Sequence, residues 1–113
     1  WENSLASFKS LGHSSNVSTE YAKAFARIEN HYFINGCFLN HDDQIIQDLH
    51  LIKEIPVILV QGRFDMICPP DTAENIHRLL PNSKLIMVHE AGHSMSEPGI
   101  SYELINATNK FKN

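Results

Sequence analysis

The chain has 113 residues, 9 of them Lys or Arg and 13 Asp or Glu, so its formal net charge is −4 and it is long enough for at most one domain. Concentrated Lys and Arg are needed to bind nucleic acid, and about 20 consecutive apolar residues to span a bilayer; the chain has neither, so we expect no nucleic acid and no membrane among its partners. Two cysteines and no signal-peptide pattern predict a cytoplasmic protein with reduced thiols.

The first predicted element is a helix that begins near Thr19, with Ser18 or Thr19 as its N-cap, because residues 20–29 are rich in strong helix formers. Its apolar stripe consists of Tyr21, Ala22, Phe25 and Ala26. Glu29 continues this row where the helical period calls for a core residue. Two interpretations are open: the helix has reached its exposed end, or the carboxylate is held on an apolar wall to receive a cation.

A turn at Asn35-Gly36 follows, and residues 40–55 carry a short helical pattern that stops before Pro56. Residues 56–60, and residues 84–88 after an initial lysine, are continuous apolar runs, which are typical of parallel strands buried on both faces.

A helix lies between the two strands, and a capping box of Asp71 and Glu74 is expected to start it. Pro98 is suited to the first turn of a last helix. The order is helices, strand, helix, strand, helix. It predicts an α/β fold, as the closing βαβα unit of a larger parallel sheet.

Each predicted strand ends in a loop that carries an ionisable side chain, Asp65 after the first and His93 after the second. Taken singly, either residue fits a purely structural role in a turn or loop. Together they lie at the carboxyl ends of neighbouring strands, where open α/β sheets place their chemistry. Their order matches the later part of the Ser…Asp…His order of α/β-hydrolases.

In that arrangement Asp65 accepts the Nδ1–H of His93, and Nε2 of His93 takes a proton from a serine. No Gly-x-Ser-x-Gly nucleophile motif is present in the 113 residues. The histidines His77, His89 and His93 show no ligand-like spacing with Asp65, so no metal site is expected. Nothing in the pattern implies any other cofactor.

Three segments carry a more specific resemblance: residues 26–33 (ARIENHYF), residues 61–69 (QGRFDMICP), and residues 90–94 (EAGHS) followed by 97–99 (EPG). They resemble the proline iminopeptidases, serine aminopeptidases of the α/β-hydrolase fold that release N-terminal proline from peptides. The resemblance implies that the chain corresponds to the C-terminal third of that family. Residues 1–40 are then the end of a helical cap, and residues 41–113 the C-terminal βαβα portion of an incomplete hydrolase core.

The resemblance also implies roles for individual residues. Asp65 and His93 match the acid and base of the catalytic triad. Glu29 and Glu2 match two cap carboxylates that bind the free amino terminus of the substrate, and Phe33 matches part of the apolar pocket for the pyrrolidine ring. In this family the secondary ammonium of the substrate is paired with two anions, which would explain why a carboxylate lies on the apolar stripe at position 29. A required free N-terminus makes a hydrolase an exopeptidase.

The sequence therefore predicts a C-terminal fragment of an enzyme that acts on peptides with N-terminal proline. The isolated chain is expected to be inactive because it lacks the serine. Two strands leave an unpaired edge, so self-association or pairing with a missing N-terminal segment is also expected. Two alternatives remain: an α/β-hydrolase that acts on another ester or amide, and a catalytically inactive fragment that serves as an interaction module.

Overall fold

A computed structural model describes residues 18–112, which divide into two compact units. The sheet unit comprises described residues 48–112, and the helical unit comprises residues 18–47. Glu2 lies outside the described residues. No helix in the described range is long and apolar enough to cross a membrane.

The sheet unit is built on two parallel strands, β1 (Val57–Gly62) and β2 (Ser83–Val88). Their register pairs Val57 with Ser83 and Gly62 with Val88, so both strands end at the same edge of the sheet. The backbone N–H of Arg63 donates to the carbonyl of Val88 across 3.0 Å and extends the pairing one residue further. The loops that follow the two strands therefore start side by side.

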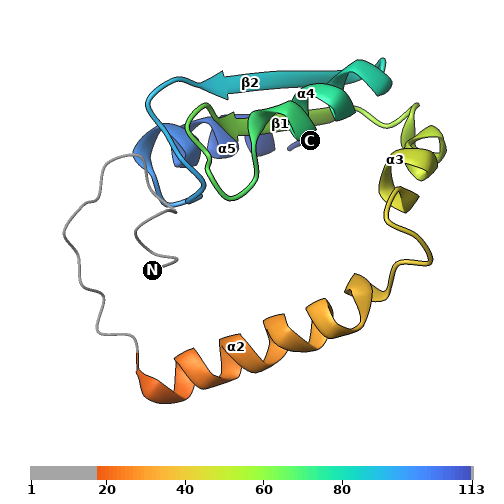
Figure 1. The fold of residues 1–113 in the computed structure, drawn as a ribbon. Helices are drawn as coiled ribbons and strands as arrows, with labels where there is room; N and C mark the ends of the chain where they lie inside the picture. The colour runs from red at the N-terminus through yellow and green to blue at the C-terminus, as the bar shows by residue number, and fades with distance from the viewer. Residues whose placement is uncertain (1–17, 113) are drawn as a thin grey trace. The chain divides into compact units, whose positions relative to one another are not determined.

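Two helices cover this strand pair, α4 (Pro70–Leu79) and α5 (Pro98–Lys110). In Figure 1, α4 lies in front of the strands and α5 behind them, and both helices contact both strands. Each helix begins with a proline, whose missing N–H costs nothing in the first turn.

The prediction that Asp71 and Glu74 form a capping box is wrong. The helix starts two residues earlier than a cap at Asp71 requires, at Pro70, with Pro69 as N-cap and no side-chain cap hydrogen bond. Asp71 lies in the first turn instead, where its negative charge suits the helix dipole.

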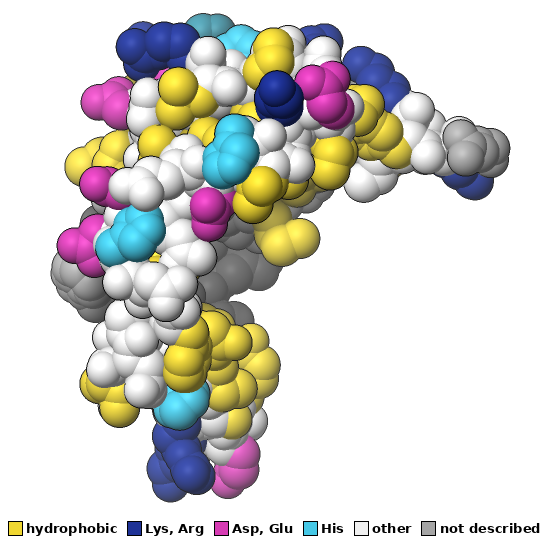
Figure 2. All heavy atoms as spheres, turned by 90° about the vertical axis from the view of Figure 1, so that its right-hand side faces the viewer, with side chains coloured by type: hydrophobic (Ala, Val, Ile, Leu, Met, Phe, Trp, Pro, Cys, Tyr) yellow, Lys and Arg dark blue, Asp and Glu magenta, His cyan; other side chains and the backbone are white. Residues whose placement is uncertain are grey.

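The core of the sheet unit lies where the helices meet the strands and loops. Its buried hydrophobic residues are Leu49, Leu80, Ala91, Ile100 and Ala107. The strands are mostly half-buried, since two strands and two helices leave parts of both sheet faces open. Figure 2 shows hydrophobic side chains at the surface among charged groups of both signs. The large exposed hydrophobic residues include Phe64, Met66 and Ile67, in the loop that carries Asp65.

The helical unit consists mainly of α2 (Thr19–Ile34). Ser18 is its N-cap and accepts the N–H of Tyr21 at 3.1 Å, as expected. At the other end, the side chain of Asn35 donates to the carbonyl of His31 at 2.8 Å. The chain then turns through the 3₁₀ helix η1 (Gly36–Phe38), and α3 (Gln44–Asp48) and η2 (Leu49–Ile52) lead towards the strands. Helix α2 buries no residue, so its apolar stripe is exposed.

Candidate active site

Asp65 lies three residues past β1, in a turn that its own side chain stabilises. Its Oδ1 accepts the backbone N–H groups of Ile67 at 2.9 Å and Cys68 at 2.8 Å, the local pattern that makes Asp a favoured turn residue. Oδ2 accepts a longer hydrogen bond of 3.3 Å from Nε2 of Gln61. Asp65 is only 7% exposed, so the turn holds a nearly buried carboxylate at the end of the sheet.

His93 lies in the loop after β2 and meets this carboxylate. Its Nδ1 is 2.9 Å from Oδ2 of Asp65, although the two residues are 28 positions apart in the sequence. An ionised carboxylate only accepts hydrogen bonds, so the contact requires the proton of the ring to be on Nδ1. The His93 side chain is 40% exposed, which leaves Nε2 as the nitrogen available to a reacting group.

Several opposing influences act on the pKa of Asp65. Burial alone raises it, but the N–H of Cys68, the hydrogen bond from His93 and the N–H of Ile67 together outweigh burial. The pKa of Asp65 is therefore lower than that of an ordinary aspartate. The carboxylate remains ionised and able to orient the His93 ring throughout the neutral pH range.

The two loops are fastened to each other by the backbone as well as by these side chains. The N–H of Phe64 donates to the carbonyl of Ala91 at 2.9 Å. At Gly62 a Cβ atom would lie 1.9 Å from the carbonyl oxygen of Gly92, so only glycine allows this approach. This role of Gly62 was not predicted from the sequence. A glycine at the end of a strand is the signal that could have revealed this close approach.

None of the residues expected to bind substrate belongs to the described part of the sheet unit. Glu29 and Phe33 belong to the helical unit, four positions apart and so on one side of α2. Glu29 is half-buried and Phe33 is exposed. The roles of Glu29, Phe33 and Glu2 stay predictions.

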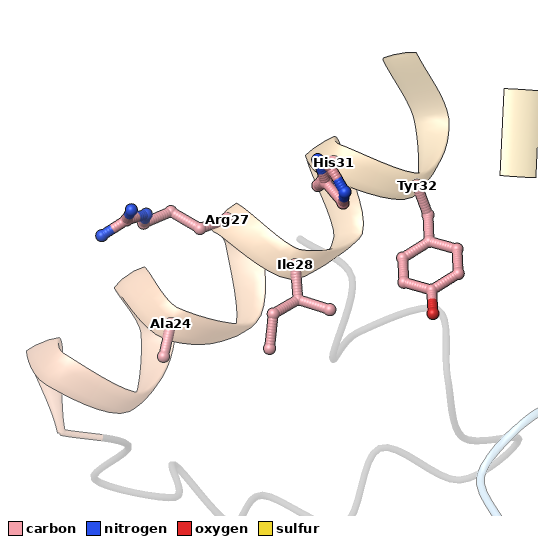
Figure 3. A pocket seen from close by; sticks show the side chains of 5 residues that line it. All are labelled: Ala24, Arg27, Ile28, His31 and Tyr32. Carbon is pink, nitrogen blue, oxygen red and sulfur yellow. The ribbon is translucent and has the colours of Figure 1, made fainter. Parts of the chain in front are cut away.

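A depression on α2 is lined by the five residues drawn in Figure 3: Ala24, Arg27, Ile28, His31 and Tyr32. All five come from this one helix, and neither Glu29 nor Phe33 is among them. Within residues 18–112, no three His, Cys, Asp or Glu side chains gather closely enough to hold a metal ion.

Comparison with known proteins places this chain in a family. A model of the α/β-hydrolase class, described as TAP-like protein, matches residues 40–101, which is more than half of the chain. This chain belongs to the TAP-like α/β-hydrolases. Its parallel strands and flanking helices are the C-terminal part of that fold, as the sequence predicted.

The resemblance of this TAP-like hydrolase chain to proline iminopeptidases is also confirmed. A protein of Leptolyngbya boryana named "Probable proline iminopeptidase" is 53% identical over 92 residues, which are 81% of this chain and 29% of that protein. The Arabidopsis thaliana "Proline iminopeptidase" is 44% identical over 82% of this chain and 24% of its own length. The "Proline iminopeptidase" of Neisseria gonorrhoeae is 36% identical over 95% of this chain and 34% of its own length.

The TAP-like hydrolase chain thus spans between 24% and 34% of the length of these three relatives. The chain contains a carboxylate, Asp65, in contact with an imidazole, His93. A buried carboxylate orients an exposed imidazole, and that combination activates a nucleophile in hydrolases.

Proposed function

We propose that this chain is the acid-and-base part of a serine exopeptidase that releases N-terminal proline from peptides. The observation that carries the proposal is the 2.9 Å contact between Nδ1 of His93 and Oδ2 of Asp65 at the shared edge of two parallel strands. The names of the relatives support the choice of substrate. In this proposal the nucleophilic serine lies in sequence that precedes the 113 residues.

In the proposed reaction, Nε2 of His93 takes the proton of the serine hydroxyl as the serine attacks the prolyl carbonyl. The resulting imidazolium is stabilised by Asp65, which keeps its negative charge throughout. His93 then gives the proton to the leaving amine, and water repeats the sequence to release proline. The depressed pKa of Asp65 favours this role, because a protonated acid cannot stabilise the imidazolium.

Selection for N-terminal proline is proposed to come from Glu2, Glu29 and Phe33. Two carboxylates pair with the secondary ammonium, and the Phe33 ring forms part of the wall for the pyrrolidine. An acylated proline carries no ammonium and leaves both carboxylates unpaired, so the enzyme rejects it.

The test is hydrolysis of a chromogenic prolyl amide, with an N-acetylated prolyl amide and an acetate ester measured beside it. It is run on the 113-residue chain and on a chain extended upstream by about 200 residues, the size of the rest of a hydrolase domain. We expect activity only in the extended chain and only on the free prolyl amide.

The other outcomes contradict parts of the proposal. Activity on the ester alone retains the hydrolase and overturns the substrate. Activity of the 113-residue chain by itself overturns the requirement for an upstream serine. Inactivity of both chains overturns the enzymatic function and leaves an inactive interaction module as the explanation.

A further inference from the structure

Glu97 is a second nearly buried carboxylate close to the site, and the proposed reaction assigns it no role. It is 6% exposed, and with Asp65 it is one of the two charged side chains buried among the described residues. Burying a carboxylate is costly unless hydrogen bonds replace its water. Its position therefore calls for a specific partner.

One such partner is the backbone next to His93. Oε1 of Glu97 accepts the N–H of Gly92 at 2.8 Å, and the backbone N–H of Glu97 donates to the carbonyl of Ser94 at 3.1 Å. The residues before and after His93 are thus both bonded to Glu97. The carbonyl of Glu97 in turn accepts the N–H of Ser101 at 2.9 Å in the first turn of α5, which joins the histidine loop to that helix.

The direction of the Glu97 side chain separates this role from ordinary helix capping. An N-cap side chain normally accepts a hydrogen bond from an N–H in the first turn of its own helix. Glu97 is the N-cap residue of α5 but makes no such bond, and its carboxylate reaches back to Gly92. Gly62 lies next to the carbonyl of the same Gly92, and its absent Cβ leaves room for that carbonyl.

We propose that Glu97 is a positioning residue. It fixes the backbone position of His93 so that Nδ1 of the ring lies within hydrogen-bond distance of Asp65. The proposal rests on the assignment of His93 as the base. Gly92 is bonded to the Glu97 carboxylate at its N–H and lies close to Gly62 at its carbonyl, so the loop has little freedom to shift. If the acceptor at position 97 retreats, the loop relaxes and the contact between Nδ1 and Oδ2 is lost.

Two conservative variants separate the acceptor from the charge. Glu97→Gln removes the charge and keeps an oxygen at the same reach. Glu97→Asp keeps the charge and withdraws the oxygen by one methylene, while aspartate remains a preferred N-cap for α5. Glu74→Asp, on the exposed side of α4, is the matched control.

The readout is the tautomer of His93 in the 113-residue chain, taken from ¹H–¹⁵N correlations of the imidazole at alkaline pH, where the ring is neutral. His93→Gln identifies the resonance, and backbone amide dispersion reports folding. This measurement needs no substrate and no serine. Its failure is therefore distinct from a failure of the proposed peptidase activity, which is tested by hydrolysis alone.

We expect the wild-type chain, Glu97→Gln and Glu74→Asp to hold the Nδ1–H form, and the ratio of Nδ1–H to Nε2–H tautomers to fall several-fold in Glu97→Asp with folding retained. An unchanged ratio in Glu97→Asp overturns the proposal. An equal fall in Glu97→Gln also overturns it, because the acceptor is still in place. Unfolding of either variant assigns Glu97 to stability alone and likewise overturns the positioning role.

Discussion

At the scale of single residues, Asp65 combines two tasks that oppose each other in most aspartates. Its burial favours the neutral acid, yet a partner that stabilises an imidazolium must be charged. The N–H groups of Ile67 and Cys68 resolve the conflict because they bind Oδ1 and leave Oδ2 for His93. The turn that places the residue is thus also what keeps it ionised.

This balance predicts a specific pH dependence of stability. Since the folded-state pKa of Asp65 is lowered, the carboxylate stabilises the fold above the ordinary aspartate pKa of about 3.9, and the contribution disappears as pH falls through the folded-state value. Asp65→Asn should be less stable than wild type at neutral pH and should approach it in acid. Urea unfolding from neutral pH down into the acid range measures the difference.

The control for that prediction is Asp42→Asn, because Asp42 is exposed. Its difference from wild type should stay near zero at every pH. A constant gap between Asp65→Asn and wild type into strong acid contradicts the assigned ionisation.

Glu29 carries a prediction about substrate choice in the longer protein. Glu29→Gln keeps the size of the side chain and removes the charge that we propose to pair with the substrate ammonium. We expect kcat/KM for a prolyl amide to fall by at least about 100-fold and kcat/KM for an aryl ester to change little, since a charged pair left unmatched costs roughly 3 kcal/mol. Equal losses on both substrates indicate that Glu29 has a structural role only.

At the scale of elements, the site depends on two loops that share one edge of a parallel pair. The bonds from Arg63 to Val88 and from Phe64 to Ala91 hold the loops at a fixed spacing. Side chains 28 residues apart meet because the strands end in register. The proposed chemistry therefore requires that β1, β2 and their loops stay ordered.

The close approach at Gly62 predicts a large effect of a single methyl group. Gly62→Ala places a Cβ against the Gly92 carbonyl, and this backbone cannot move without separating the loops. We expect a destabilisation of about 3 kcal/mol or more and loss of the Nδ1–H tautomer of His93. Gly36→Ala is the comparison: no atom lies within 4 Å of the new Cβ, so its cost comes only from the positive φ of 55°, and the tautomer should be unaffected.

The packing of α4 against the sheet gives a second prediction, with neighbouring leucines as a matched pair. Leu80 is 3% exposed and Leu79 is 47% exposed. Leu80→Ala should lower the free energy of unfolding of the sheet unit by about 2–4 kcal/mol, because it opens a cavity in the core. Leu79→Ala should cost less than about 1 kcal/mol. Urea titration of both variants checks this, and similar losses contradict the assigned core.

At the scale of the whole molecule, the sheet ends where a further strand could be added. Val57 and Arg63 donate their N–H groups to the β2 side. Backbone N–H groups alternate along a strand, so those of Ile58 and Val60 lie on the opposite edge of β1. In the described part of the chain the sheet has two strands, so no strand pairs with that outer edge of β1.

We predict that this edge drives concentration-dependent self-association of the 113-residue chain. Val60→Pro removes an N–H from the outer edge only and should weaken association while the fold persists, since proline is tolerated at strand edges. Leu59→Pro removes an N–H directed towards β2 and should unfold the sheet unit. Sedimentation velocity and circular dichroism distinguish the two. Equal association of Val60→Pro and wild type rules out the edge as the interface.

The amino-acid sequence by itself determined the two strands, the helices around them and the order of Asp65 and His93. These are local signals: continuous apolar runs, prolines at helix starts and a glycine-bounded turn are each legible within a few residues. The family resemblance was legible for the same reason, because it lies in short, uninterrupted segments.

The tertiary structure alone decided which side chains meet. Asp71 and Glu74 match a capping box, yet the prolines at positions 69 and 70 start α4 earlier and leave the box unformed. No local pattern marks Glu97 for burial, and its contact with Gly92 follows only when α5 packs against the strands. The sequence shows which chemical groups are present and in what order. Their distances depend on strand register and helix packing, which no local pattern encodes.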